Sequence, residues 1–244
     1  MLAKQFRQMR LTERHVGFVQ PEHPSEDMPP PPAGMRDAQP EDHQATIAGL
    51  LGPDWGHDEL WVFAYGSLIW KPACDFVEMR TGLVHGWHRA FCLGWNTRFR
   101  GSDENPGLML ALDRGGACKG VLYRLPPDRI HECMTRLLER EMGWLPSAFP
   151  PRWVNARSGE RTIKALTFCI DRNSGRYVSG LTNQAIADVL AKAAGSRGSM
   201  AEYLYATVSH LQAVGIHDPH LWQLQSLVAE RIEAAYEPDR QVLL

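Results

Sequence analysis

The amino-acid sequence predicts an α+β protein, in which most strands precede most helices. Apolar or alternating runs typical of strands recur between residues 61 and 125 and again at 162–170. Helical patterns gather after residue 182, and one more lies in the middle of the chain. Several short antiparallel strands can close into a small barrel-like sheet with helices packed outside it, and this is the architecture we expect.

Residues 1–58 differ in composition from the rest of the chain. The stretch PEHPSEDMPPPPAGMRDAQPEDHQ is rich in proline and acidic residues, which is typical of an extended or disordered segment. A short helix is possible at 41–51, where apolar residues fall on one side. We therefore expect a partly extended N-terminal extension at 1–58 and a folded domain at 59–240. The extension is either a linker or an arm that packs on the domain or on a second subunit.

Two patterns carry the strand predictions. Residues 61–65 are continuously apolar, as in a strand covered on both faces. Residues 83–93 alternate, which places Leu83, His85, Trp87, Arg89, Phe91 and Leu93 on one side. Further strands are expected at 108–113, 118–125 and 162–170, with a hairpin turn at the Asp-Arg-Gly-Gly of 113–116.

Four amphipathic helices are expected, at 128–142, 183–194, 199–214 and 220–235. Glycine favours helix C-caps because it tolerates the left-handed conformation found there. We therefore expect Gly143, Gly195 and Gly215 to end the first three of these helices.

The composition argues against several classes of partner. The formal net charge is −2, so no basic field favours nucleic acid or an anionic membrane. No stretch approaches the roughly 18 apolar residues of a membrane-spanning helix, and the N-terminus lacks the apolar core of a secretory signal. We expect a cytoplasmic protein, and the sequence leaves its oligomeric state open.

The cysteines and histidines do not predict a metal site. The five cysteines are widely spaced and form no C-x-x-C pair, which favours reduced thiols in a cytoplasm. His85 and His88 form an H-x-x-H, but a spacing of three residues puts them on opposite faces of a strand. We expect neither a metal nor a disulfide framework.

A carboxylate lies on the apolar side of the middle helix. That stripe consists of Ile130, Cys133, Met134, Leu137, Leu138 and Met142. Glu141 falls on the same stripe, near the helix C-terminus, where both burial and the helix dipole raise the pKa of a carboxyl group. Such a group is suited to move protons near neutral pH. The alternative is that the last turn is overwound and Glu141 reaches solvent.

The apolar run of 61–65 is interrupted by a glycine-serine step and resumes at once. Gly66 allows a sharp turn at the end of a strand, and successive backbone N–H groups in such a turn can bind a carboxylate or an oxyanion. The step does not match a phosphate-binding P-loop, and Ser67 does not lie in a G-x-S-x-G elbow. A β-bulge without a ligand is the alternative.

The combination of these features resembles the ChaC-like γ-glutamylcyclotransferases, in particular their longer bacterial members. The resemblance covers about residues 60–235 and rests on six segments in the family's order. They read WVFAYGSLIWKP (61–72), GWHRAFCL (86–93), RGSDENPG (100–107), GVLYRL with REM (120–125 and 140–142), and AEYLYATVSHLQAVGIHD (201–218).

This resemblance implies a γ-glutamylcyclotransferase-like fold and a lyase that needs no cofactor. Its reaction would cleave glutathione to 5-oxoproline and cysteinylglycine. The family's γ-glutamyl-binding loop falls on Tyr65, Gly66, Ser67 and Leu68, and its acid/base glutamate falls on Glu141. Further substrate contacts are expected from Arg100 and Tyr203.

Two departures from the family pattern leave the substrate open beyond its γ-glutamyl group. Leu108 stands where the family usually has arginine, and GWLPSAFPPRW (143–153) replaces a glycine- and tyrosine-containing run. A basic contact would then come from Arg98 or Arg100. The alternatives are a cyclotransferase for other γ-glutamyl amines or dipeptides and a non-catalytic γ-glutamyl-binding module.

Overall fold

A computed structural model describes residues 8–20, 30–53, 55 and 59–236. The chain divides into two compact units. The first unit contains the described residues within 1–29, 91–109 and 178–244. The second contains the described residues within 30–90 and 110–177.

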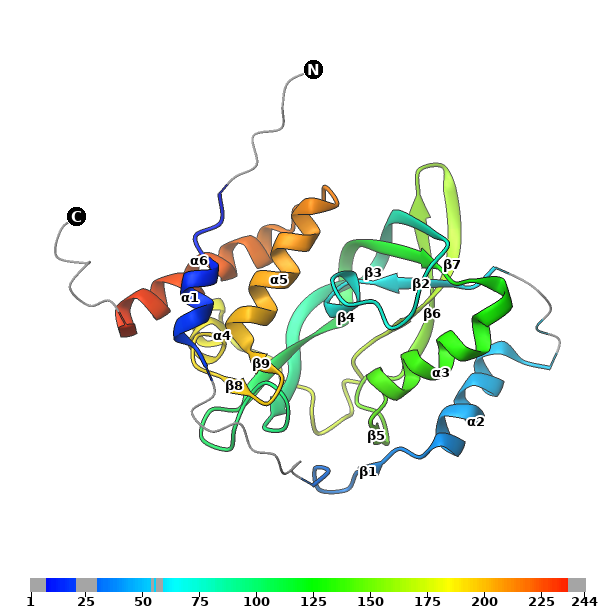
Figure 1. The fold of residues 1–244 in the computed structure, drawn as a ribbon, viewed down its shortest axis with the longest axis horizontal. Coiled ribbons are helices and arrows are strands. Elements are labelled where there is room, and N and C mark those ends of the chain that lie inside the picture. Colours follow the sequence, from blue (N-terminus) through cyan, green and yellow to red (C-terminus); the bar gives the residue numbers. More distant parts are fainter. Residues whose placement is uncertain (1–7, 21–29, 54, 56–58, 237–244) are drawn as a thin grey trace, which may run out of the picture. The chain divides into compact units, whose positions relative to one another are not determined.

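A five-stranded closed barrel, in the order β2-β4-β3-β6-β7, forms the largest sheet of the described residues (Figure 1). Strand β2 pairs antiparallel with β4 and parallel with β7, while β6 pairs antiparallel with β3 and β7. The strands are β2 (Trp61–Ala64), β3 (Glu78–Asn96), β4 (Gly107–Arg124), β6 (Pro151–Ser158) and β7 (Arg161–Phe168). The predicted α+β class and barrel-like sheet are therefore confirmed.

Strand β2 lies in the middle of the second unit's core. All four of its residues are buried, as the continuous apolar run predicts. At its end, β4 approaches so closely that a Cβ on Gly120 would lie 2.5 Å from the carbonyl oxygen of Ala64. A glycine at this position therefore lets β4 pass the point where β2 leaves the sheet.

The predicted hairpin at 113–116 is wrong. Residues 107–124 form the single strand β4, and β3 is likewise one strand of 19 residues. Gly115 and Gly116 have φ angles of 103° and 66°, so these glycines change the backbone direction locally without reversing the chain. The Gly115 carbonyl accepts a 3.0 Å hydrogen bond from the Nδ1 of His88 on β3.

Strand β6, which begins at the second residue of the Pro150-Pro151 pair, was not predicted from the sequence. Pro151 is the first residue of the strand, a position where a missing N–H is tolerated. Within β6, Val154 and Ala156 are buried, and the strand pairs along its whole length with β7.

The middle helix, α3 (Ile130–Glu141), begins after a 3₁₀ turn, η2 (Pro127–Arg129), and not at residue 128 as expected. The whole predicted apolar stripe of α3 is buried. Its C-cap is Met142 and not Gly143, because the chain turns directly into the short strand β5 (Trp144–Leu145).

The expected helix at 41–51 is confirmed as α2 (Pro40–Leu51), which packs on α3 (Figure 1). The short strand β1 (Arg36–Asp37) precedes it and pairs with β5. Helix α1 (Glu13–Phe18) packs on two helices of the first unit. Parts of the extension therefore pack as an arm on the domain, whereas residues 21–29 of the stretch expected to be extended lie outside the described residues.

Three late helices complete the first unit, and α5 lies beside α6 in Figure 1. They are α4 (Asn183–Leu190), α5 (Met200–Ala213) and α6 (Pro219–Tyr236). Gly215, with φ 74°, follows α5 as predicted. Gly195 does not cap α4: it lies in β8 (Ala194–Gly195), which pairs with β9 (Gly198–Ser199), and a Cβ there would lie 2.8 Å from the backbone of Gly101.

Candidate active site

The glycine-serine step is the place where β2 becomes a 3₁₀ turn. Strand β2 ends at Ala64, Gly66 is the N-cap residue, and η1 (Ser67–Ile69) follows. The Gly66 carbonyl accepts a 2.9 Å hydrogen bond from the Ile69 amide, and the Ser67 carbonyl accepts a 2.8 Å hydrogen bond from the Lys71 amide. The interruption in the apolar run is therefore a tight turn within the fold.

This turn presents backbone donors in an apolar setting. At the start of a helical turn the first N–H groups have no partner within the turn. Among the described residues, the amides of Gly66, Ser67 and Leu68 have no hydrogen-bond acceptor. Tyr65 and Leu68 are each 8% exposed, so little water competes for these donors.

Glu141 is the last residue of α3, and its side chain is only 15% exposed. Burial raises the pKa of its carboxyl group above the ordinary value of 4.5, and the neighbouring Arg140 guanidinium opposes that rise. The prediction from the helix stripe, that this carboxyl group is largely removed from water, is therefore confirmed. A carboxylate in this state is a stronger base than an exposed one.

Arg140 connects Glu141 to the turn. Its Nε lies 3.0 Å from Oε1 of Glu141, and its Nη2 donates to Oγ of Ser67 at 2.9 Å. It also donates to the carbonyl oxygen of Lys71. One guanidinium thus brings together two segments that are some seventy positions apart in the sequence.

Two further side chains hold the turn, and the sequence did not single them out. The Nε of Arg89, on β3, donates to the Tyr65 carbonyl at 2.6 Å, and the Tyr123 hydroxyl, on β4, donates to the Ile69 carbonyl at 3.1 Å. Arg89 falls between Trp87 and Phe91 on one side of an alternating strand. A charge among apolar neighbours is the same signal that identified Glu141, so Arg89 could have been found in that way.

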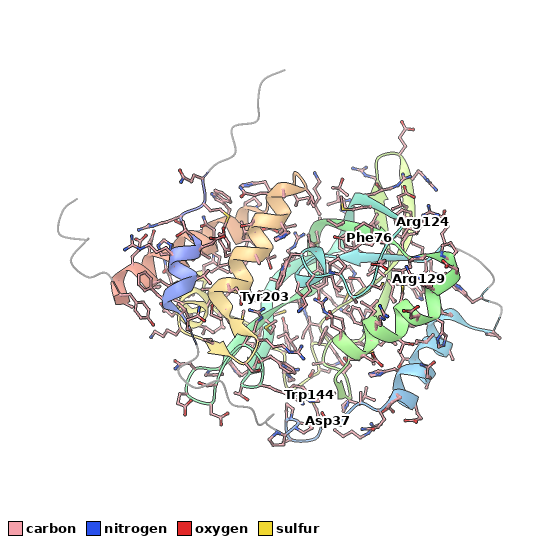
Figure 2. The ribbon with its side chains drawn as sticks, viewed as in Figure 1. Asp37, Phe76, Arg124, Arg129, Trp144 and Tyr203 are labelled. Carbon is pink, nitrogen blue, oxygen red and sulfur yellow. The ribbon has the colours of Figure 1, made fainter. Side chains whose placement is uncertain are left out.

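The chain just after Glu141 is held by the N-terminal extension. His43 of α2 is buried, and its Nε2 donates to the Met142 carbonyl at 3.0 Å. The amide of Ala38 donates to the Gly143 carbonyl at 3.0 Å. Asp37 pairs with Trp144 across β1 and β5, and their side chains lie close together in Figure 2.

Arg100 and Tyr203, the other predicted substrate contacts, lie together in the first unit. The Arg100 guanidinium is 5.3 Å from the Tyr203 ring centre. It donates to the Ser199 carbonyl at 2.8 Å and to the Glu202 carboxylate at 3.0 Å. These contacts attach the loop after β3 to the start of α5.

The described part of the chain contains no cluster of three or more histidine, cysteine or acidic side chains that could hold a metal ion. His85 is exposed, and His88 is occupied at Nδ1 by the Gly115 carbonyl. Nor does any described helix combine the length and the apolar character needed to cross a bilayer.

A family model described as "ChaC-like protein" matches residues 60–231. Because this range covers more than half of the chain, the chain belongs to the ChaC-like family. The family match begins just before β2 and therefore excludes α2 and β1 of the N-terminal extension.

Curated relatives and a solved structure agree with this assignment. A glutathione-specific γ-glutamylcyclotransferase of Escherichia coli is 40% identical over 184 residues, which cover 74% of this chain and 78% of that protein. Glutathione-specific γ-glutamylcyclotransferase 1 of Mus musculus is 29% identical, covering 79% and 89%. A yeast γ-glutamyl cyclotransferase specific to glutathione superposes with a TM-score of 0.63 at 22% identity over 70% and 96% of the two chains, which supports the fold.

Proposed function

We propose that this chain is a glutathione-specific γ-glutamylcyclotransferase, which converts glutathione to 5-oxoproline and cysteinylglycine. The single observation that carries the proposal is the Arg140 bridge, which holds a buried carboxyl group beside a turn with available backbone donors. The similarity to the Escherichia coli enzyme supports the same substrate.

In this reaction the substrate supplies its own nucleophile. The α-amine of the γ-glutamyl residue attacks the γ-carbonyl carbon and closes a five-membered lactam, and the C–N bond to cysteine then breaks. A well-oriented intramolecular attack has an effective molarity of about 10⁵–10⁸ M. The main task of the protein is therefore to fold the γ-glutamyl chain back on itself and to move protons.

We assign substrate binding to Tyr65, Gly66, Ser67 and Leu68. The N–H groups of the turn would donate to the substrate α-carboxylate or to the carbonyl oxygen as it becomes an oxyanion. Removal of one oxyanion donor typically costs about 3 kcal/mol of transition-state stabilisation. The apolar setting of the turn strengthens such hydrogen bonds.

We assign acid/base catalysis to Glu141. The α-amine of the substrate titrates near about 8 and must lose a proton before it attacks. The buried Glu141 carboxylate would accept this proton and pass it to the departing cysteine nitrogen. It would then accept the second proton, which the attacking nitrogen loses as the lactam forms, and pass it to the same nitrogen, so that cysteinylglycine leaves in its ammonium form. The proton balance closes without a cofactor or a metal ion.

Arg100 and Tyr203 stay predicted substrate contacts, and the N-terminal boundary at residue 59 stays a proposal. We further propose that the protein acts in the cytoplasm, where its five free cysteines would remain reduced. The Tyr203→Phe variant tests one of these contacts. A raised KM for glutathione with an unchanged kcat supports the contact, and unchanged kinetics would exclude it.

The substrate is tested by incubating the purified protein with glutathione and, separately, with γ-glutamylalanine, and by measuring 5-oxoproline. Release from glutathione in preference to the dipeptide supports the proposal. Release from the dipeptide alone favours a cyclotransferase for other γ-glutamyl amines. If a folded protein releases 5-oxoproline from neither substrate, the remaining alternative is a non-catalytic γ-glutamyl-binding module.

A further inference from the structure

The carbonyl group of Tyr65 lies where β2 leaves the sheet. The pairing between β2 and β4 ends at Ala64 and Val121, so Tyr65 lies beyond the paired residues. Arg89 reaches this point from β3 and donates from Nε to the Tyr65 carbonyl at 2.6 Å, while its Nη2 donates to the Lys119 carbonyl on β4. The Arg89 side chain therefore links the end of β2 to β4 just beyond their last paired residues.

The guanidinium of Arg89 is a fixed charge in the protein interior. The residue is 5% exposed, and a charge buried in this way acts over a lower dielectric than one in water. Arginine suits the position because its planar group donates in two directions at once, whereas lysine is a compact point charge. The two carbonyl contacts fix the group against the end of β2.

The Tyr65 carbonyl and the Gly66 amide belong to the same planar peptide group. In a trans peptide the C=O and N–H bonds point in opposite directions, so the Gly66 N–H points away from Arg89. Within the described residues this N–H has no acceptor. A cation at the oxygen end withdraws electron density from the nitrogen end, and hydrogen bonds linked in this way strengthen one another.

We propose that Arg89 is a positioning residue for the reaction: its buried guanidinium polarises the Tyr65–Gly66 peptide and thereby makes the Gly66 amide a stronger donor to the developing oxyanion of the γ-glutamyl carbonyl. In this role Arg89 does not touch the substrate. The inference rests on the proposed cyclotransferase function, because an oxyanion forms only if that reaction takes place.

Arg89→Gln and Arg89→Lys test the proposal, with Arg80→Gln as the matched control. Arg80 lies on the same strand, is about a third exposed and pairs with Glu78 near the surface. With glutathione as substrate, we expect Arg89→Gln to lower kcat about tenfold, less than the loss of a whole oxyanion donor, with KM within about twofold. Arg89→Lys keeps the charge and should retain at least about a third of the wild-type kcat, and Arg80→Gln should match the wild type.

Three results would overturn the proposal. These are a wild-type kcat in Arg89→Gln, a kcat in Arg89→Lys as low as in Arg89→Gln, and an effect confined to KM. If the wild-type protein itself releases no 5-oxoproline from glutathione, the proposed function fails first, and that outcome is distinct from a normal rate in the Arg89 variants.

An NMR measurement keeps the proposal testable if Arg89→Gln does not fold. In the inactive Glu141→Gln protein, which retains Arg89, glutathione is added to saturation and the backbone amide protons are followed. We expect the Gly66 amide proton to lie downfield of those of Ser67 and Leu68 and to move further downfield with glutathione. A Gly66 amide that lies upfield of both and does not move overturns the proposal.

Discussion

At the scale of a single residue, the burial of Glu141 lowers the stability of the protein at neutral pH and makes its carboxylate a stronger base. Its pKa in the folded protein is raised above the ordinary value of 4.5, so the folded state holds this proton more tightly than the unfolded chain does. The stability that this group contributes is therefore fully present below about pH 4.5, the pKa of the unfolded chain. It is lost as the pH rises through the folded-state pKa. Above that pKa the protein carries a buried charge whose desolvation is incompletely offset.

Glu141→Gln should therefore stabilise the protein at neutral pH while it abolishes proton transfer. Relief of the desolvation cost should raise Tm by about 2–4 °C for each kcal/mol recovered. Thermal unfolding measured from pH 4 to pH 8 checks this, because the gain over the wild type should shrink as the pH falls. Glu139→Gln, an exposed position on the same helix, is the control; a lower Tm for Glu141→Gln at all pH values would contradict the account.

Arg140 should set the lower pH limit of activity. Its guanidinium lowers the pKa of Glu141 against the larger effect of burial, so Arg140→Met should raise that pKa further. Since the base must be ionised, the acidic limb of the pH dependence of kcat/KM should move to higher pH. Arg136→Met, which removes an exposed pair with Glu132 one turn earlier, should leave the limb in place; a limb that moves to lower pH in Arg140→Met would refute this role.

At the scale of elements, α2 and β1 hold the end of α3 although they lie outside the family match. His43→Ala leaves the buried Met142 carbonyl without its donor, and we expect the free energy of unfolding to fall by about 1–3 kcal/mol. Because Met142 follows Glu141 directly, kcat should fall more than KM rises.

Two comparisons separate this role of His43 from a general loss of packing. His43→Gln keeps a side-chain N–H and should recover part of kcat, and Gln44→Ala, an exposed neighbour on α2, should be nearly neutral. Denaturant unfolding and steady-state kinetics of the three variants measure this. If His43→Ala unfolds more easily but keeps its kcat, α2 stabilises the domain without positioning Glu141.

The elements also show which parts of the fold could be predicted from sequence. The helix stripe placed Glu141 in the interior because burial along a helix follows a local period. The hairpin prediction failed because Gly115 and Gly116 suit either a reversal or a change of direction within one strand, and only the pairing with distant residues decides between them. The contact of His43 with Met142 spans 99 positions and leaves no local signal.

At the scale of the whole molecule, we propose that Glu141, held by Arg140 beside the turn of Tyr65 to Leu68, carries out the proton transfers of glutathione cyclisation. The turn and Glu141 both lie in the second unit, whereas Arg100 and Tyr203 lie in the first. The residues of this claim therefore all belong to one compact unit.

The most direct test is the rate of 5-oxoproline release from glutathione by the wild-type protein and by Glu141→Gln. We expect the wild type to release 5-oxoproline and cysteinylglycine in equal amounts. The variant, still folded, should lose about 10²–10⁴-fold in kcat, the usual contribution of a general acid/base. A folded Glu141→Gln protein that turns over glutathione at the wild-type rate would contradict the account.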